Sequence, residues 1–283
     1  MADDTGVLSR QQLFNTARRR ERLHGANLEG VDLHEMRLEG AIFTDCNFRN
    51  AKLTGANLSA AILTGCTFEG AEMQDCQLRE SQLVKADLSS ADLSGAVLVE
   101  ADLSGAKMDY TLLVGANLAG AYLVGVQAFL SDFSGANLRQ AMLNGSYLAL
   151  CQFNETQGSQ LQALKTDFTG ASLVKANFDR SSLLGANFSL ADLEEASLRG
   201  CPLKQANFFQ ANLRGARFTK SILEGAHLMG VKGDSAQLNG VNLKGANMID
   251  ARFPYANFDS SFLLQAVTEG ADFEGASFAE ARR

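Results

Sequence analysis

The sequence predicts a solenoid in which the chain turns every five residues and successive turns stack on one another. Stepping by five from Leu23 to Phe278 gives 52 positions, here called centres, and 47 of them are Leu, Phe or Met. A small residue (Ala, Ser, Cys, Val or Thr) stands two positions before 49 of these centres, and 23 of the 26 glycines stand two positions after one. A period of five fits neither an amphipathic helix nor a simple strand.

Each centre, and the small residue two positions before it, is predicted to point inward, while the other residues face water. One pentad has too few apolar atoms for a core of its own, so neighbouring turns must share one. Val, Ile and Thr never stand two positions after a centre, which indicates a tight turn that excludes stiff β-branched side chains.

Pentads such as Ala26-Asn27-Leu28-Glu29-Gly30 resemble the A(D/N)LXX consensus of the pentapeptide-repeat family, and the resemblance covers about 90% of the chain. The resemblance implies an all-β fold, a right-handed quadrilateral β-helix with four pentads in each coil. Residues 23–281 would then form about 13 coils, in a rod about 60 Å long at the usual spacing between strands.

Residues 1–22 precede the repeat and are predicted to contain a short amphipathic helix, with Ser9 as the N-cap before Arg10. We expect this segment to cap the first coil, whose backbone groups would otherwise be unpaired. The basic run Arg18-Arg19-Arg20 leaves a contact with nucleic acid or with a membrane as the alternative.

Residues 154–165 are the strongest irregularity of the repeat. Gly158 and Ala163 occupy consecutive centres, and Leu161 takes the place of a small residue. Two alternatives fit this pattern: a loop that projects from the coils, or two irregular pentads within them.

The last coil has little after it, because only three residues follow the pentad of Phe278. We therefore expect the C-terminal coil to pack against another protein or against a second copy of the chain, which would make a homodimer.

The net charge of -7 disfavours direct binding of nucleic acid. The acidic start, Met1-Ala2-Asp3-Asp4, lacks the basic and apolar segments of a secretory signal, so a bacterial cytoplasm is the expected compartment. The stretch from Thr111 to Ser131 is free of charge and long enough for a membrane helix. Gly115, Gly120 and Gly125 interrupt it at the repeat interval, so no membrane span is predicted.

The cysteines all fall in the small inward position, where they are predicted to fill the core as free thiols: Cys46, Cys66, Cys76, Cys151 and Cys201. Cys46 and Cys66 should lie on adjacent coils, and a disulfide between them is the alternative.

The histidines fall at outward positions, with no neighbours typical of a metal site or a catalytic triad: His24, His34 and His227. We predict that the protein is not an enzyme and holds no metal or cofactor.

One side of the predicted coil, here called the Leu23 face because its centres are Leu23 and every fourth centre after it, carries many outward apolar residues. Ten of them form the predicted partner-binding stripe: Ile42, Ile62, Val84, Tyr122, Val124, Met142, Leu184, Ile222, Phe262 and Leu264. Such a stripe usually marks a contact surface, so we predict a rod-shaped scaffold or adaptor that binds another protein. Tolerated surface variation is the alternative.

The opposite side, the Leu33 face, carries a net charge of -8, of the -9 that residues 23–283 hold. Its acidic residues include Asp32, Glu72, Asp92, Asp132, Asp192 and Asp272. Acidic family members that protect DNA gyrase from quinolones resemble duplex DNA, which makes topoisomerase protection an alternative function. Duplex DNA of about 60 Å holds about 35 charges, so this face would be a weak imitation.

A third function follows from the residues Gln11 to Leu33, where a short helix leads directly into A(D/N)L pentads. This arrangement is similar to the pentapeptide modules found beside loading proteins of type VI secretion systems, which implies an accessory or effector-loading role.

Overall fold

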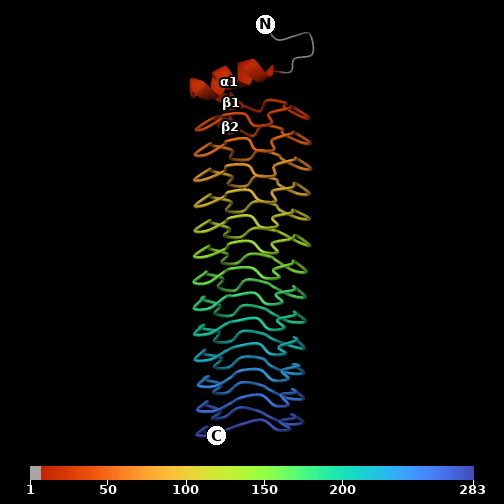
Figure 1. Ribbon diagram of the computed structural model, residues 1–283, viewed down its shortest axis with the longest axis vertical. Coiled ribbons are helices and arrows are strands. Elements are labelled where there is room, and N and C mark those ends of the chain that lie inside the picture. Colours follow the sequence, from red (N-terminus) through yellow and green to blue (C-terminus); the bar gives the residue numbers. More distant parts are fainter. Residues whose placement is uncertain (1–7) are drawn as a thin grey trace. The chain divides into compact units, whose positions relative to one another are not determined.

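The structure, a computed structural model, describes residues 8–283. The chain forms two compact units, the first ending at Asn137 and the second running from Leu138 to Arg283. Figure 1 shows that each unit is a stack of coils. Within residues 8–283, no helix has both the length and the apolar character that crossing a membrane requires.

The coils pair as parallel strands whose partners lie 20 residues apart. Strand β1 (Arg22–His24) pairs with strand β2 (Ile42–Thr44), and Leu23 stands opposite Phe43. Elsewhere the pairing is reduced to single bridges at the same spacing, such as Asn27 with Asn47. Each coil therefore contains four pentads, which confirms a β-helical solenoid.

The turns explain the glycines of the repeat. Every residue two positions after a centre, from Gly25 to Glu280, has a positive φ, between 53° and 70°. At Asn50, for example, the N–H of Ala51 donates to the carbonyl of Phe48 at 3.0 Å and closes the turn. Positive φ suits glycine and strains β-branched residues most, so the predicted tight turn is confirmed.

The Asp or Asn of the repeat closes the same turn from outside. Asn47 Oδ1 accepts a hydrogen bond from the backbone N–H of Arg49 at 3.0 Å, and Asp92 Oδ1 accepts one from Ser94 N–H at 2.9 Å. The turn needs only a short side chain with an acceptor oxygen, so the amide and the carboxylate serve it equally.

The core of each unit is a stack of the centres. Phe48 and Phe68 lie one above the other, with parallel rings 5.0 Å apart. In the second unit, Phe168, Phe188 and Phe208 stack with successive separations of 4.9 and 5.0 Å. All of these side chains are buried, as predicted from the repeat.

Residues 154–165 stay within the coils. Gly158 N–H donates to the carbonyl of Asn177 at 2.8 Å, and Gln162 bridges both Met142 and Ser182 in the regular register. Leu161 and Ala163 are buried. Of the two alternatives, the irregular pentads are therefore present, and the projecting loop is wrong.

Helix α1 (Arg10–Arg18) begins at Ser9, which is the predicted N-cap. Ser9 Oγ accepts from Gln12 N–H at 3.3 Å, and Gln12 Oε1 accepts from Ser9 N–H at 2.7 Å, which forms a capping box. Leu13 and Ala17 are buried, and α1 lies beside β1 in Figure 1.

Candidate partner-binding surfaces

The predicted stripe is interrupted in the first unit. Its row of bridged residues runs Ile42, Ile62, Gln82, Asp102, Tyr122, so two polar residues separate the isoleucines from the tyrosine. The isoleucines and Val84 are only partly exposed. Tyr122 and Val124 are 42% and 39% exposed and form the most accessible part of the stripe in this unit.

In the second unit the stripe residues are likewise separated along the coils. Asn242 stands between Ile222 and Phe262, and the guanidinium of Arg282 lies 4.9 Å from the centre of the Phe262 ring. Leu184, Ile222 and Leu264 are exposed, and Met142 is partly exposed. Each predicted residue reaches the surface, but the stripe is not continuous.

A denser group of apolar side chains lies elsewhere in the first unit. Tyr110, Leu112, Phe129 and Leu130, here called the Tyr110 cluster, are 41% to 54% exposed. The rings of Tyr110 and Phe129 lie 6.1 Å apart and perpendicular, and Tyr110 N–H donates to the Phe129 carbonyl. These residues occupy adjacent coils on both sides of one corner.

The Tyr110 cluster was missed because sorting the sequence by face separates residues that meet across a corner. Three of its four residues lie in the charge-free stretch from Thr111 to Ser131, which is the sequence signal that points to them. The second unit has its own exposed aromatic and aliphatic residues outside the stripe: Tyr147, Leu150, Leu190 and Phe209.

The acidic Leu33 face is also interrupted. In the first unit its bridged row runs Asp32, Lys52, Glu72, Asp92, Leu112, Asp132. In the second unit Asp192 is separated from Asp272 by Asn212, Lys232 and Arg252. Except for Glu72, each predicted acid accepts a hydrogen bond from the backbone N–H two residues later: Asp32, Asp92, Asp132, Asp192 and Asp272.

The carboxyl group of Asp92 on this face has a shifted pKa. Partial burial by itself raises its pKa, but hydrogen bonds from Ser94 and Gln74 outweigh the burial and lower the pKa below its ordinary value. The Gln74 amide donates to Asp92 Oδ2 at 2.7 Å. These hydrogen bonds tie the carboxylate to the coil.

All five cysteines are free and buried, as predicted. Cys46 and Cys66 lie on adjacent coils, where Cys46 Sγ donates to the carbonyl of Leu23 at 3.4 Å and Cys66 Sγ donates to the carbonyl of Phe43 at 3.3 Å. The neighbouring Cys66 thiol lowers the pKa of Cys46 to about 7 against the opposing effect of burial, and the proximity of Cys46 together with burial raises the pKa of Cys66. Because Cys46 is 1% exposed, its sulfur is closed to a substrate.

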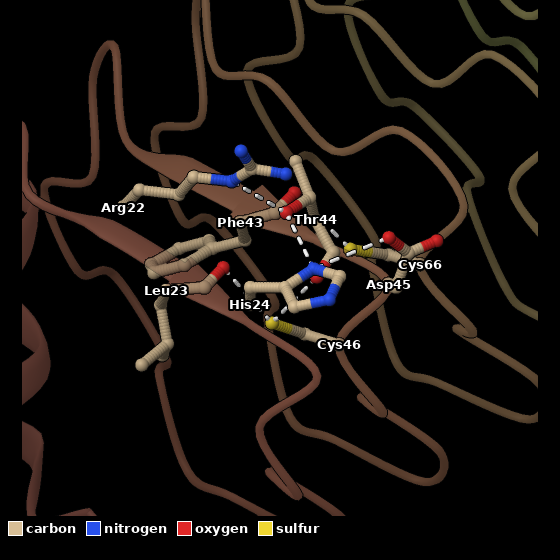
Figure 2. Close-up of polar contacts among 8 residues, drawn as sticks. All are labelled: Arg22, Leu23, His24, Phe43, Thr44, Asp45, Cys46 and Cys66. Carbon is tan, nitrogen blue, oxygen red and sulfur yellow. Dashed lines mark hydrogen bonds and ion pairs between the residues drawn. The ribbon is translucent and has the colours of Figure 1, made fainter.

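Figure 2 shows the polar residues that surround this thiol pair. His24 Nδ1 lies 3.1 Å from Thr44 Oγ1 and 3.3 Å from Asp45 Oδ2. A catalytic relay needs a histidine that contacts the acid and the nucleophile through different ring nitrogens, whereas here one nitrogen faces both. Among the described residues, no group of three or more His, Cys, Asp or Glu is placed to hold a metal ion.

Comparison with known proteins agrees with this architecture. The sequence profile of the pentapeptide repeat region matches residues 41–118 and 171–248, which is more than half of the chain. The chain belongs to the pentapeptide repeat family. A second profile, of eight-copy pentapeptide repeats, matches residues 22–59, 131–157 and 234–263. No curated protein sequence matches this pentapeptide repeat protein.

Solved structures of similar proteins include HetL, a pentapeptide repeat protein involved in heterocyst differentiation regulation from the cyanobacterium Nostoc sp. strain PCC 7120. It is 24% identical, over 96% of this chain and 93% of HetL, with a TM-score of 0.28. QnrB1, a plasmid-mediated fluoroquinolone resistance protein, is 21% identical over 75% of this chain and 92% of QnrB1, with a TM-score of 0.23.

Rfr23, a pentapeptide repeat protein from the cyanobacterium Cyanothece 51142, is 22% identical. The match covers 53% of this chain and 100% of Rfr23, with a TM-score of 0.24. At such TM-scores the family assignment rests on the sequence profiles and on the coil geometry.

Proposed function

We propose that this pentapeptide repeat protein is a non-enzymatic scaffold that binds a partner protein through exposed apolar side chains. The observation that carries the proposal is the Tyr110 cluster, four large apolar side chains on adjacent coils. Single apolar residues are normal on a surface, but a group of them usually marks a contact site. Tyr122 and Val124 of the predicted stripe supply a second apolar site in the same unit.

A pull-down from native lysate, followed by binding measurements with the recovered partner, tests this proposal. Two double variants place charges in the two sites: Tyr110→Lys with Leu130→Lys, and Tyr122→Lys with Val124→Lys. Lysine is tolerated at the turn positions 110 and 130, because Lys85 has the same positive φ. We expect one of the two to weaken binding by about tenfold or more, as truncating a central anchor does.

Gln82→Lys is the matched control, because Gln82 is an exposed polar residue of the Leu23 face between Ile62 and Asp102. It should leave binding unchanged. A partner that binds both apolar variants as well as it binds the wild-type protein would remove these surfaces from the proposal.

The topoisomerase alternative receives less support from the acidic face. Lys52 and Leu112 interrupt its row in the first unit, and the Asp92 carboxylate serves a turn hydrogen bond that an amide also makes. A gyrase supercoiling assay with a quinolone separates the two functions. Rescue by the wild-type protein that is lost in Glu72→Gln with Asp92→Asn would favour the DNA mimic.

We also propose a contact between two copies through the C-terminal coil. Phe273 and Phe278 are partly exposed there and, with Leu263 and Arg283, help to line a cavity of about 370 Å³. A strand edge pairs readily with another edge, and a twofold axis makes one edge complementary to itself. Analytical ultracentrifugation checks this, and a monomer at every concentration would contradict it.

One compartment and one function stay predictions from the sequence. The compartment is the bacterial cytoplasm, and the function is the type VI secretion role that rests on Gln11 to Leu33. The first agrees with five reduced thiols, which reducing compartments maintain.

A further inference from the structure

We propose that a groove between helix α1 and the first coil binds a short acidic peptide segment that carries an apolar side chain. The groove is a hollow of about 410 Å³ in the first unit, which is within the usual range for a ligand pocket. Its lining residues come from both elements: Phe14, Ala17, Arg18, Arg20, Arg37 and Glu39. The site is separate from the apolar surfaces proposed above.

Three of the lining residues are arginines that no carboxylate of residues 8–283 neutralises. In the part of the chain that the structure describes, Arg18, Arg20 and Arg37 make no ion pair. Arginine binds carboxylates through two parallel hydrogen bonds, so three guanidinium groups around one hollow form a site for acidic side chains.

Neighbouring arginines outside this hollow do form ion pairs with carboxylates. Arg10 lies 3.5 Å from Asp32, and Arg19 lies 3.6 Å from Glu21. The one acid that lines the hollow is Glu39. Its Oε1 accepts a hydrogen bond from the Asn57 amide at 2.6 Å, which holds the carboxylate against the neighbouring coil.

Apolar residues also line the hollow. Ala17 is buried, Phe14 is partly exposed, and a second hollow shares Phe14 and Arg37 and adds Met36. A ligand made only of carboxylates would leave the Phe14 ring in water. A peptide with an apolar residue between acidic ones would cover this ring and reach the guanidinium groups together.

Helix stabilisation does not account for this set of arginines. Arg18 lies in the last turn of α1, where a positive charge favours the helix dipole. Arg37, however, belongs to the first coil. Arg20 has a φ of 52°, and its guanidinium packs beside Gly40, where an added β-carbon would lie 3.6 Å from Arg20 Nε.

The charge of the whole chain favours a short peptide over a polynucleotide. Residues 23–283 contain 29 acidic and 20 basic side chains, and this excess would repel a long polyanion. A short peptide can bind in the groove without extending over the acidic coils.

Fluorescence anisotropy with the full chain tests the proposal. The probe is a fluorescein-labelled peptide of sequence Glu-Asp-Leu-Glu-Phe-Asp-Glu, and the comparison peptide is its neutral form, Gln-Asn-Leu-Gln-Phe-Asn-Gln. We expect the acidic probe to bind to the wild-type protein. The double variant Arg18→Gln with Arg37→Gln should bind the probe at least about tenfold more weakly. Phe14→Ala should also weaken binding, because the apolar contact is lost.

Arg79→Gln is the matched control, because Arg79 is an exposed arginine of the same unit that does not line the groove. It should bind the probe like the wild-type protein. The proposal is overturned if the acidic probe does not bind at about 1 mM, if the neutral peptide binds equally well, or if the arginine variant keeps full affinity. Tighter binding of an oligothymidylate than of the peptide would assign the groove to nucleic acid instead.

Discussion

The ring of Phe178 fills the space that a side chain at Gly158, one coil earlier, would occupy. A β-carbon added to Gly158 would lie 2.7 Å from two ring atoms of Phe178 and 2.6 Å from Leu161 Cδ2. Gly158 has no positive φ, so the backbone does not require glycine there. Phe178 and Leu161 therefore fill the space that a large side chain at the centre Gly158 would take.

Gly158→Leu restores the repeat consensus, yet we expect it to lower the free energy of unfolding by about 1–3 kcal/mol, because a filled core has no room for the added atoms. Guanidinium unfolding measures the change. Phe178→Leu in the same chain should recover part of the loss, since the two positions share one space. Wild-type stability of the single variant would show that the space is not filled.

This shared space marks the limit of what the sequence predicts about the fold. The inward centres, the turns and the 20-residue coil follow from a local rule that every pentad repeats, as at Leu28 and Gly30. The compensation between Gly158 and Phe178 acts across 20 residues and depends on the shapes of the side chains, so a five-residue pattern does not contain it.

The sequence did not predict the Tyr110 cluster, for a similar reason. The stripe residues Tyr122 and Val124 do reach the surface, because outward positions follow from the period. Tyr110 and Leu130 stand at turn positions and meet Leu112 across a corner. Their proximity depends on how the corner folds, which the sorting into faces did not represent.

Gly115→Val should be destabilising through the backbone alone. Gly115 has a φ of 66°, and outside its chain neighbours no atom lies within 4 Å of an added β-carbon, so we expect the loss to come from conformational strain. We expect about 1–2 kcal/mol less stability in chemical unfolding. Gly115→Asn is the control and should be close to the wild-type protein, because Asn50 adopts the same conformation. Equal losses in both variants would argue against strain at φ.

Stability should fall in alkaline solution because of buried thiols. Burial raises the pKa of Cys76 and of Cys201 from an ordinary value of 9.0 to about 12. Above pH 9 the unfolded thiols lose their protons and the folded ones keep theirs, so this stabilisation is complete below pH 9 and is lost toward pH 12. Between pH 8 and pH 10 the ionisation of each unfolded thiol should lower the free energy of unfolding by about 1 kcal/mol.

The double variant Cys76→Ala with Cys201→Ala provides the control for this pH dependence. Alanine is the usual residue at this position of the repeat, so the variant should fold. Its unfolding free energy should decline less between the two pH values. A decline equal to that of the wild-type protein would mean that other groups cause the effect.

Asp92→Asn distinguishes the contribution of the turn hydrogen bond to stability from the contribution of the carboxylate charge. The amide oxygen should keep the hydrogen bond to Ser94 N–H, but the amide nitrogen replaces the oxygen that accepts from Gln74, so stability at neutral pH should fall by about 0.5–1 kcal/mol. Asp92→Ala should cost about 1–3 kcal/mol, because it removes the acceptor of both hydrogen bonds. Because hydrogen bonds outweigh burial and lower the Asp92 pKa, its contribution is lost as the pH falls through the folded value. The Asn variant should lack this acid sensitivity, and a loss of stability at neutral pH as large as that of Asp92→Ala would show that the charge matters.

Leu13→Glu tests whether α1 protects the first coil. Leu13 is completely buried, and a carboxylate at that position would lose its hydration, so the helix should leave the coil to hydrate it. The amides of Leu28 and Leu33, which donate to the carbonyls of Asn47 and Lys52, should then exchange their hydrogens faster as the uncovered coil frays. Gln11→Glu places the same charge on an exposed position of α1 and should leave exchange unchanged. If both variants protect Leu28 and Leu33 as the wild-type chain does, the first coil is stable without its helix, and α1 is free to serve the arginine groove alone.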